Sequence, residues 1–338
     1  MDNKNIRQWV ADTIAAPKKA ALPVLSFPCV QLMGLTVKEL ISAADVQAKG
    51  LKLVADRTPM AASVSLMDLS VEAEAFGSTI RVSDGEVPTV IGAIVSDEDE
   101  ADALRVPKVG DGRTGINVDG IRKAAELIQD RPVFAGVIGP FSLAGRLMDV
   151  SEALVYCYDE PDMVHTVMKK ATAFLIDYCN AYKAAGANGV LLAEPLTGLL
   201  SPALAREFSH PYVKELIDAV QDDSFALFYH NCGNTVPQMA QDVYQLGAMG
   251  YHFGNCINMA DIMDAAPANV LVMGNVDPAG ELRNGTPDSV RAATRQMMEQ
   301  CCRYPNFVIS SGCDIPPLTP WENIDAFFGA VEDYYASL

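Results

Sequence analysis

The stretch Phe225-Ala226-Leu227-Phe228-Tyr229-His230-Asn231-Cys232-Gly233 is an apolar run that ends in a His-x-Cys pair. A second apolar run, Phe307-Val308-Ile309-Ser310-Ser311-Gly312-Cys313, ends in another cysteine. Both runs have the length and composition of buried β-strands, and each carries its polar residues at the carboxyl end. Parallel α/β sheets place their chemistry at this edge. The two stretches therefore predict a parallel α/β sheet with a site at its strand ends.

His230, Cys232 and Cys313 are candidate ligands of one zinc ion. Imidazole and thiolate are ligand types that zinc prefers, and three protein ligands with an open fourth position define a catalytic site. The residues alone leave a second interpretation open. A His-x-Cys pair is a weak signal, and buried cysteines are common as small hydrophobic residues.

Short apolar runs alternate with helical patterns along the chain. Helical patterns cover residues 152–185, interrupted at Pro161, then 202–222 and 287–302. Eight runs predict strands, at 22–28, 61–66, 133–138, 189–193, 225–229, 250–253, 270–274 and 307–311. Eight such units predict a single (β/α)8 TIM barrel over residues 1–338. The turn-rich segment 77–111 predicts an inserted hairpin and loop between the second and third strands, over the mouth of the barrel.

The composition and charge of the chain limit the kinds of molecule that it is expected to bind. Half of the 338 residues are apolar and 20% are charged, which suits one large core without a disordered tract. The formal net charge of −18 argues against nucleic acid, because phosphate binding needs clustered Lys and Arg. The same charge argues against binding to an anionic membrane. It leaves room for a protein partner.

The sequence also predicts a cytoplasmic location. Residues 1–7 lack the basic region and uninterrupted apolar stretch of a secretory signal, and no transmembrane span is evident. Eight cysteines without disulfide-type spacing, in a chain of this length, suit a reducing compartment.

Several motifs together resemble one known family. The sequence is similar to the uroporphyrinogen decarboxylase superfamily, and within it to the cobalamin:coenzyme M methyltransferase branch. The matching segments run through most of the chain: Met67-Asp68-Leu69-Ser70-Val71-Glu72-Ala73-Glu74-Ala75-Phe76-Gly77, Gly139-Pro140-Phe141-Ser142-Leu143-Ala144, Glu194-Pro195-Leu196-Thr197-Gly198-Leu199-Leu200-Ser201-Pro202, His230-Asn231-Cys232-Gly233, Gly274-Asn275-Val276-Asp277-Pro278 and Ser311-Gly312-Cys313-Asp314-Ile315-Pro316-Pro317.

The resemblance implies a (β/α)8 barrel and a zinc ion held by His230, Cys232 and Cys313. It implies an enzyme of one-carbon metabolism that moves a methyl group from a methylated corrinoid to a thiol such as coenzyme M. A separate corrinoid protein usually delivers the corrinoid in this family, so a transient protein partner is implied. Coordination to zinc deprotonates a thiol that is otherwise mostly protonated at neutral pH. We therefore expect the thiol sulfur at the open zinc position.

Two alternatives to methyl transfer stay open. The first is a metal-independent decarboxylase acting on a tetrapyrrole or a smaller acid. The decarboxylases of the superfamily carry an arginine-rich amino-terminal signature, where this chain has Phe27-Pro28-Cys29-Val30-Gln31-Leu32-Met33-Gly34. Without arginines there, the carboxylates of a porphyrinogen would lack their counter-charges. The second alternative is a non-catalytic corrinoid- or tetrapyrrole-binding protein.

The fourth zinc position is not assigned by the sequence. Relatives commonly carry an Asp-Glu pair after the sixth strand, where this chain has Gly254-Asn255-Cys256. An amide is a poorer zinc ligand than a carboxylate. Water, Cys256 or a neighbouring acid could fill the position, and the departure is also compatible with an acceptor other than coenzyme M.

Further polar residues at predicted strand ends have both functional and structural interpretations. Glu194 is a candidate catalytic residue that orients substrate or a zinc ligand, or else caps the following loop. Asp277 could accept a hydrogen bond from a ligating imidazole, or else start a turn. His252 could face the barrel mouth or simply pack. With Asn255, Asp277 and His252 are the candidates for contacts to the cofactor.

Asp314 and Arg146 are two further candidates for contacts in the site. Asp314 follows Cys313 and could support the environment of its thiolate or bind the substrate loop, and Arg146 is a candidate for binding a sulfonate. The sequence does not identify the acceptor thiol, the methyl donor upstream of the corrinoid, or the oligomeric state.

Overall fold

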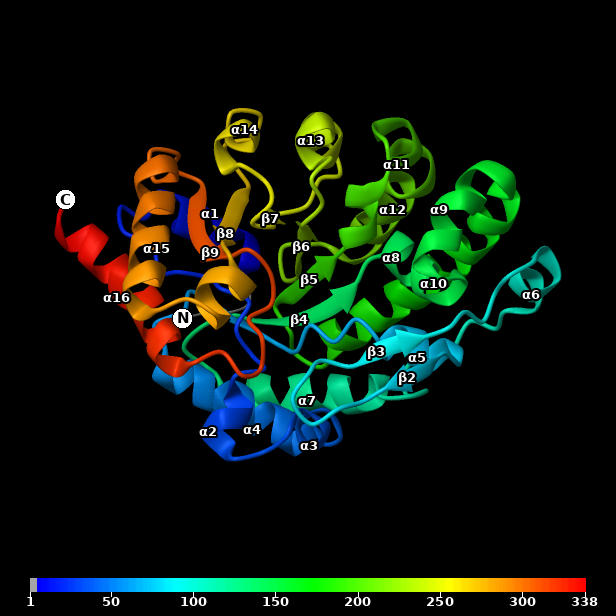
Figure 1. The fold of residues 1–338 in the computed structure, drawn as a ribbon, viewed down its shortest axis with the longest axis horizontal. Helices are drawn as coiled ribbons and strands as arrows, with labels where there is room; N and C mark the ends of the chain where they lie inside the picture. The colour runs from blue at the N-terminus through cyan, green and yellow to red at the C-terminus, as the bar shows by residue number, and fades with distance from the viewer. Residues whose placement is uncertain (1–4) are drawn as a thin grey trace.

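A curled parallel sheet wrapped by helices forms the centre of the protein (Figure 1). The computed structural model describes residues 5–338. The sheet has seven strands in the order β1-β4-β5-β6-β7-β8-β9, and all neighbours are parallel. These strands are β1 (Ser63–Val64), β4 (Val133–Ile138), β5 (Gly189–Ala193), β6 (Ala226–Asn231), β7 (Gly250–Phe253), β8 (Leu271–Val276) and β9 (Phe307–Ser311). The arrangement is that of a TIM-barrel-like α/β fold.

The prediction of a regular strand over residues 22–28 is wrong. Residues 21–24 instead connect the two edges of the sheet. The Leu22 amide donates to the Ile309 carbonyl in β9 (3.0 Å), and the Ala21 carbonyl accepts from the Ala61 amide just before β1 (2.8 Å). Side-chain hydroxyl groups make the next two links, because Ser310 Oγ donates to the Leu22 carbonyl (2.7 Å) and Ser311 Oγ accepts from the Val24 amide (3.0 Å). The repeating ladder of a strand is therefore missing from this segment.

Helices cover the outer face of the sheet. The three predicted helical regions become five helices: α9 (Val150–Asp159), α10 (Pro161–Ala184), α11 (Pro202–Phe208), α12 (His210–Val220) and α15 (Pro287–Cys301). Pro161 begins α10, a position where its missing amide hydrogen costs nothing. The remaining α-helices are α1 (Ile6–Ala15), α2 (Cys29–Met33), α3 (Val37–Ile41), α4 (Ala44–Arg57), α5 (Val71–Phe76), α6 (Glu98–Ala103), α7 (Thr114–Leu127), α8 (Pro140–Met148), α13 (Ala240–Tyr244), α14 (Met259–Met263) and α16 (Trp321–Ala336). In the described part of the chain, no helix is long and apolar enough to cross a membrane.

An antiparallel pair of short strands lies between β1 and β4 in the chain. β2 (Thr79–Arg81) pairs with β3 (Thr89–Ile91), with Thr79 opposite Ile91. The turn that joins them, residues 83–87, faces the segment 314–318 that follows β9, and both line one cavity. The pair is half-exposed, unlike the buried strands of the main sheet.

Two hydrophobic layers hold the sheet. One fills the space between the strands and the surrounding helices, and the other fills the inside of the curl. Inside, the rings of Phe134 in β4 and Phe228 in β6 stack with centroids 4.7 Å apart, and Trp9 of α1 packs on both. The large rings occupy the interior at the amino-terminal half of the strands. The carboxyl ends are left for the polar residues.

A buried acid lies beside the sheet. Glu72 of α5 accepts a hydrogen bond from the Ile138 amide through Oε1 (3.1 Å), and its buried Oε2 has no partner among residues 5–338. Burial raises the pKa of Glu72 to about 7. Between the ordinary pKa of 4.5 and about 7, the folded state binds a proton that the unfolded state does not bind. The contribution of Glu72 to stability is therefore lost as pH rises through this range.

We expect Glu72→Gln to remove that pH dependence. Glutamine keeps the acceptor for Ile138 and resembles the protonated acid. At pH 5 the free energies of unfolding of the wild type and the variant should be close, whereas at pH 8 the variant should be more stable, on the order of 1–3 kcal/mol. Chemical denaturation at the two pH values measures this. A constant difference between the two proteins at both pH values would contradict the assignment.

Candidate metal centre

The three predicted ligands meet at the carboxyl ends of β6 and β9. Side chains two residues apart on a strand point to the same face, which puts His230 and Cys232 on one side of the chain. His230, Cys232 and Cys313 line one small cavity of about 70 Å³. Cys313 Sγ lies 3.6 Å from Nε2 of His230. Apolar walls surround the three donors, including Val24, Leu191 and Ala193.

The two thiols differ in their acidity. A hydrogen bond from Cys313, followed by the neighbouring His230 imidazole, lowers the pKa of the Cys232 thiol. The same hydrogen bond, together with burial, raises the pKa of Cys313. The pair is thus one thiolate that accepts a hydrogen bond from one thiol. A thiolate is the form of cysteine that binds metals.

A chain of hydrogen bonds fixes the tautomer of His230. His252 Nε2 lies 2.8 Å from the Ser311 carbonyl oxygen, which can only accept, so Nε2 carries the hydrogen. Burial lowers the pKa of His252 well below its usual value, so the ring is neutral and Nδ1 is an acceptor. His252 Nδ1 lies 2.6 Å from Nδ1 of His230, which must therefore donate. This leaves a lone pair on Nε2 of His230, the nitrogen that faces Cys313.

The donor set is of the kind that zinc binds, although the described residues do not already enclose a metal position. Among residues 5–338, no group of three His, Cys, Asp or Glu side chains has the arrangement of a ready-made metal site. The observed separation is nevertheless suitable. Tetrahedral bonds of about 2.05 Å to nitrogen and about 2.3 Å to sulfur put the two donor atoms about 3.6 Å apart, the distance found between His230 Nε2 and Cys313 Sγ.

Two glycines let the cysteine loops approach. A Cβ atom at Gly254 would lie 2.3 Å from Cβ of Cys232, and one at Gly312 would lie 2.7 Å from the Asn255 amide nitrogen. The loop that carries Gly254 is held by Asn275, whose side-chain amide donates to the carbonyls of Gly254 (2.8 Å) and Ile257 (2.7 Å). Asn275 is not among the residues predicted from the sequence, although it lies in the motif Gly274-Asn275-Val276-Asp277-Pro278.

Glu194 contacts the start of α8 instead of the three donors. Its Oε1 accepts from the amide and hydroxyl of Ser142 (2.6 Å each), and its Oε2 accepts from the Phe141 amide (3.1 Å). Burial raises the pKa of Glu194 to about 7. Its backbone amide donates to the His230 carbonyl (2.8 Å), so the residue lies behind the ligand strand.

The candidates for cofactor contacts lie in different surroundings. Asp277 accepts from the amides of Ala279 (2.9 Å) and Gly280 (2.8 Å) and caps the short π-helix η3 (Pro278–Arg283). His252 is buried against His230, as described above. Asn255 is exposed on the loop after β7, and the next residue, Cys256, donates its thiol hydrogen to the Cys232 carbonyl (2.8 Å). The Cys256 sulfur therefore points at the backbone of a ligand residue.

Asp314 and Arg146 lie in neighbouring cavities. Asp314 lines the small cavity with the three donors and also a larger one beside it, and its buried Oδ1 has no partner in the described part of the chain. Arg146 lines a third cavity of about 400 Å³ and donates to the Ser142 carbonyl (3.0 Å). The larger cavity, the third cavity and the small one share Met67, so all three open around the carboxyl end of the sheet.

Comparisons with known proteins agree with the motifs. The family model "Uroporphyrinogen decarboxylase (URO-D)" matches residues 24–334. A methylcobamide:CoM methyltransferase MtbA from Methanosarcina acetivorans is 25% identical over 272 residues, which are 79% of this chain and 78% of the relative. A uroporphyrinogen decarboxylase from Coxiella burnetii is 26% identical over 291 residues, 82% of this chain and 78% of the relative. The solved structure of a methyltransferase from Methanosarcina mazei has a TM-score of 0.86 at 23% identity, and covers 98% of this chain and 99% of its own.

We expect Gly254→Ala to disrupt the centre. The added methyl group would lie inside the contact distance of Cys232, so the loop after β7 must move away from the cysteine. Overpacking of this kind costs about 1–3 kcal/mol, which should lower the melting temperature. Gly85→Ala is the matched control, because a Cβ atom there meets only Leu318 at 3.5 Å. Equal melting temperatures for the two variants would show that the close approach is unimportant.

Proposed function

The chain belongs to the uroporphyrinogen decarboxylase (URO-D) family, and we propose that within this family it is a methyltransferase, acting as one domain over residues 1–338. It moves a methyl group from a methylated corrinoid to a small thiol, coenzyme M or a related acceptor. The observation that carries the proposal is the convergence of His230, Cys232 and Cys313 on one cavity. Relatives named methylcobamide:CoM methyltransferases support the reaction.

We assign a zinc ion to these three residues. Nε2 of His230 has a free lone pair, Cys232 is a thiolate, and Cys313 Sγ is at a suitable 3.6 Å from the nitrogen. When bound, zinc deprotonates a thiol placed in its open coordination position. Two cysteinates make the site formally neutral, so that the sulfur of a bound acceptor stays electron-rich and reactive.

The residues of the chain position the acceptor and keep the site dry. His252 orients His230, and the apolar walls formed by Val24, Leu191 and Ala193 exclude water from the donors. In the proposed reaction the acceptor sulfur attacks the methyl carbon. A carbon–sulfur bond forms while the cobalt–carbon bond breaks, its electron pair stays on the corrinoid, and the thiol proton leaves to solvent. Holding the two reactants in line is the main contribution of the protein.

The decarboxylase alternative receives less support from the structure. Relatives named uroporphyrinogen decarboxylase match at similar identity, so identity does not separate the two activities. In residues 27–34, however, Phe27, Cys29 and Val30 are buried. The side-chain amide of Gln31 donates to the carbonyls of Pro317 (2.9 Å) and Thr319 (2.8 Å). This segment therefore packs against the chain and offers no cation to a tetrapyrrole carboxylate.

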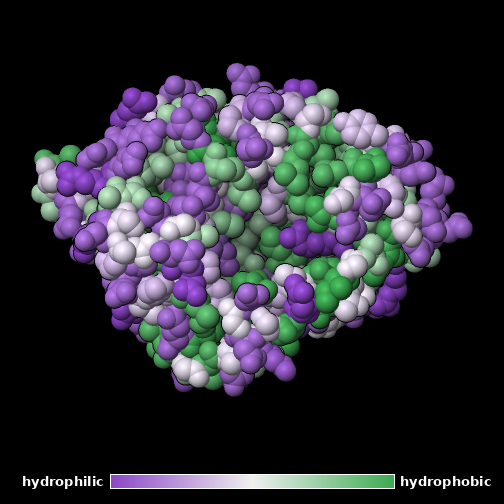
Figure 2. Space-filling view, viewed as in Figure 1, coloured by the Kyte–Doolittle hydropathy of each residue, from purple (hydrophilic) through white to green (hydrophobic). Residues whose placement is uncertain are grey.

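A corrinoid protein is the proposed partner, in the cytoplasm. Figure 2 shows a hollow near the centre of one face of the molecule, with hydrophobic atoms gathered along one of its walls. A corrinoid presented by another protein could approach the carboxyl ends of the strands from such a hollow. The thiol centre suits a compartment in which cysteines stay reduced.

The first test combines metal content and turnover. We expect about one zinc per chain in the anaerobically purified wild type, and little in Cys313→Ala, since a ligand is lost. Circular dichroism should show that the variant is folded, because barrel stability rests on the core. Cys302→Ala, which changes a half-buried thiol outside the small cavity, should keep its zinc.

Mixing the protein with methylcobalamin and a thiol under anaerobic conditions should convert the methyl–cobalt absorption spectrum to that of cobalt(I). The conversion should stop in Cys313→Ala and after zinc is chelated. No spectral change with any thiol would count against methyl transfer, and carbon dioxide release that is insensitive to chelators would favour the decarboxylase alternative.

We also expect His252 to set the affinity of the centre for zinc. His252→Phe removes the nearer acceptor for Nδ1 of His230, at 2.6 Å, and leaves only the His252 carbonyl oxygen at 3.2 Å. Loss of such an orienting partner weakens metal binding about 10–100-fold. His252→Asn offers a side-chain oxygen near the same position and should restore part of the affinity. Competition with a chromogenic zinc chelator measures both constants. Equal affinities for the wild type and His252→Phe would contradict the orienting role.

A further inference from the structure

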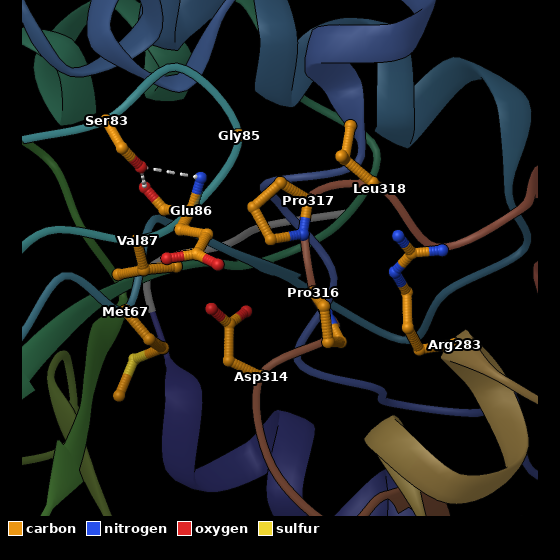
Figure 3. A pocket seen from close by; sticks show the side chains of 10 residues that line it. All are labelled: Met67, Ser83, Gly85, Glu86, Val87, Arg283, Asp314, Pro316, Pro317 and Leu318. Atoms are coloured by element: carbon orange, nitrogen blue, oxygen red, sulfur yellow. Dashed lines mark hydrogen bonds between the residues drawn. The ribbon is translucent and has the colours of Figure 1, made fainter.

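The larger cavity beside the three donors is bounded by two segments far apart in the chain. It measures about 710 Å³ and lies between the turn at residues 83–87 and the segment 314–318 (Figure 3). Met67 and Asp314 line both this cavity and the small one with His230, Cys232 and Cys313. A molecule whose sulfur reaches the donors would therefore extend its remaining atoms into the larger cavity.

Arg283 is a cation in the wall of this cavity. It is the last residue of η3 and is partly buried. It forms no ion pair or hydrogen bond with any other described residue, in a chain that has 43 acidic and 25 basic residues. By contrast, the buried Arg113 pairs with both Asp68 and Glu74. A partly buried guanidinium without a counter-charge is costly, so an anionic ligand is the partner that the cavity wall lacks.

The acidic groups of the cavity lie apart from Arg283. In Figure 3 the carboxylates of Glu86 and Asp314 are near each other, and Arg283 stands on the other side, beside Pro316 and Leu318. An anionic group would be repelled by Glu86 and attracted to Arg283. Because Asp314 directly follows Cys313, the acidic side is also the side of the three donors. The charges therefore favour one orientation, with the anionic end of the ligand away from the donors.

We propose that Arg283 binds the anionic group, a sulfonate or a carboxylate, of the acceptor thiol. The proposal rests on the proposed methyl transfer to a thiol, and it names the class of acceptor. The planar guanidinium can donate two parallel hydrogen bonds to a sulfonate or carboxylate, which a lysine at this position could not do in the same geometry. The sulfur end then reaches toward His230, Cys232 and Cys313. Neutral and cationic thiols lack this contact.

The test compares thiols that differ mainly in the charge at one end. The rate of demethylation of methylcobalamin is measured with 2-mercaptoethanesulfonate, neutral 2-mercaptoethanol and cationic cysteamine. In the wild type, kcat/KM should be highest for the sulfonate and lowest for cysteamine. In Arg283→Gln, the ratio of kcat/KM for the sulfonate to that for mercaptoethanol should fall about 10–100-fold, mainly through a higher KM. Arg303→Gln, which changes an exposed arginine stacked on Tyr304, should keep the wild-type ratio.

An unchanged ratio in Arg283→Gln, or a wild type that prefers cysteamine, would overturn the assignment even if methyl transfer occurs. If no thiol is methylated, the proposed reaction fails, and binding still tests Arg283. Isothermal titration calorimetry with 2-mercaptoethanesulfonate should show binding to the wild type that is about 10–100-fold weaker in Arg283→Gln. Equal binding to both proteins, or none to the wild type, would overturn the role of Arg283 in anion recognition.

Discussion

The in-register pairing of parallel strands β6 and β7 is the constraint on which the centre depends. His230 pairs directly with His252 across these strands, so two imidazole rings from segments 22 residues apart lie side by side and share a hydrogen bond. A shift of one residue in this register would turn one of the two rings to the other face of the sheet. The backbone ladder thus determines which nitrogen of His230 is available to a metal. Ser311, at the end of β9, completes the arrangement by accepting from His252.

The sequence predicts a strand well where its hydrogen bonds to the neighbouring strands are made by backbone groups. The expected runs at 133–138, 189–193, 250–253 and 307–311 coincide with β4, β5, β7 and β9. The expected strand at 22–28 fails because serine side chains supply half of its links, and no local pattern shows a distant hydroxyl group. The pairing of His252 with His230 could not be predicted either, because it depends on register between strands. Asp277 and Glu194 stand at strand ends as expected, but in the structure their carboxylates bond to the starts of η3 and α8.

Charge is distributed unevenly around the carboxyl ends of the strands. Two buried acids, Glu72 beside β4 and Glu194 behind β6, have raised pKa values because burial disfavours their ionised forms. In front of β6, Glu86 and Asp314 line the larger cavity together with Arg283, which has no ion-pair partner among residues 5–338. In a chain with a net charge of −18, Arg283 is the one basic residue in the wall of this cavity. Specific recognition of an anion in such a protein depends on few groups.

The segment 21–24 joins the two edges of the sheet through a mixture of backbone and hydroxyl hydrogen bonds, and this seam lies next to Cys313. A seam held by fewer ladder bonds than the other strand pairs is a natural place for local opening, since such openings begin where backbone hydrogen bonding is weakest. Val24 belongs both to the seam and to the wall of the donor cavity. Local opening between residues 21–24 and β9 would thus let water or solutes reach the cysteine sulfur atoms by a route separate from the cavities at the carboxyl ends of the strands. The hydrogen bonds that close the curled sheet therefore also protect the cysteine thiols from oxidation.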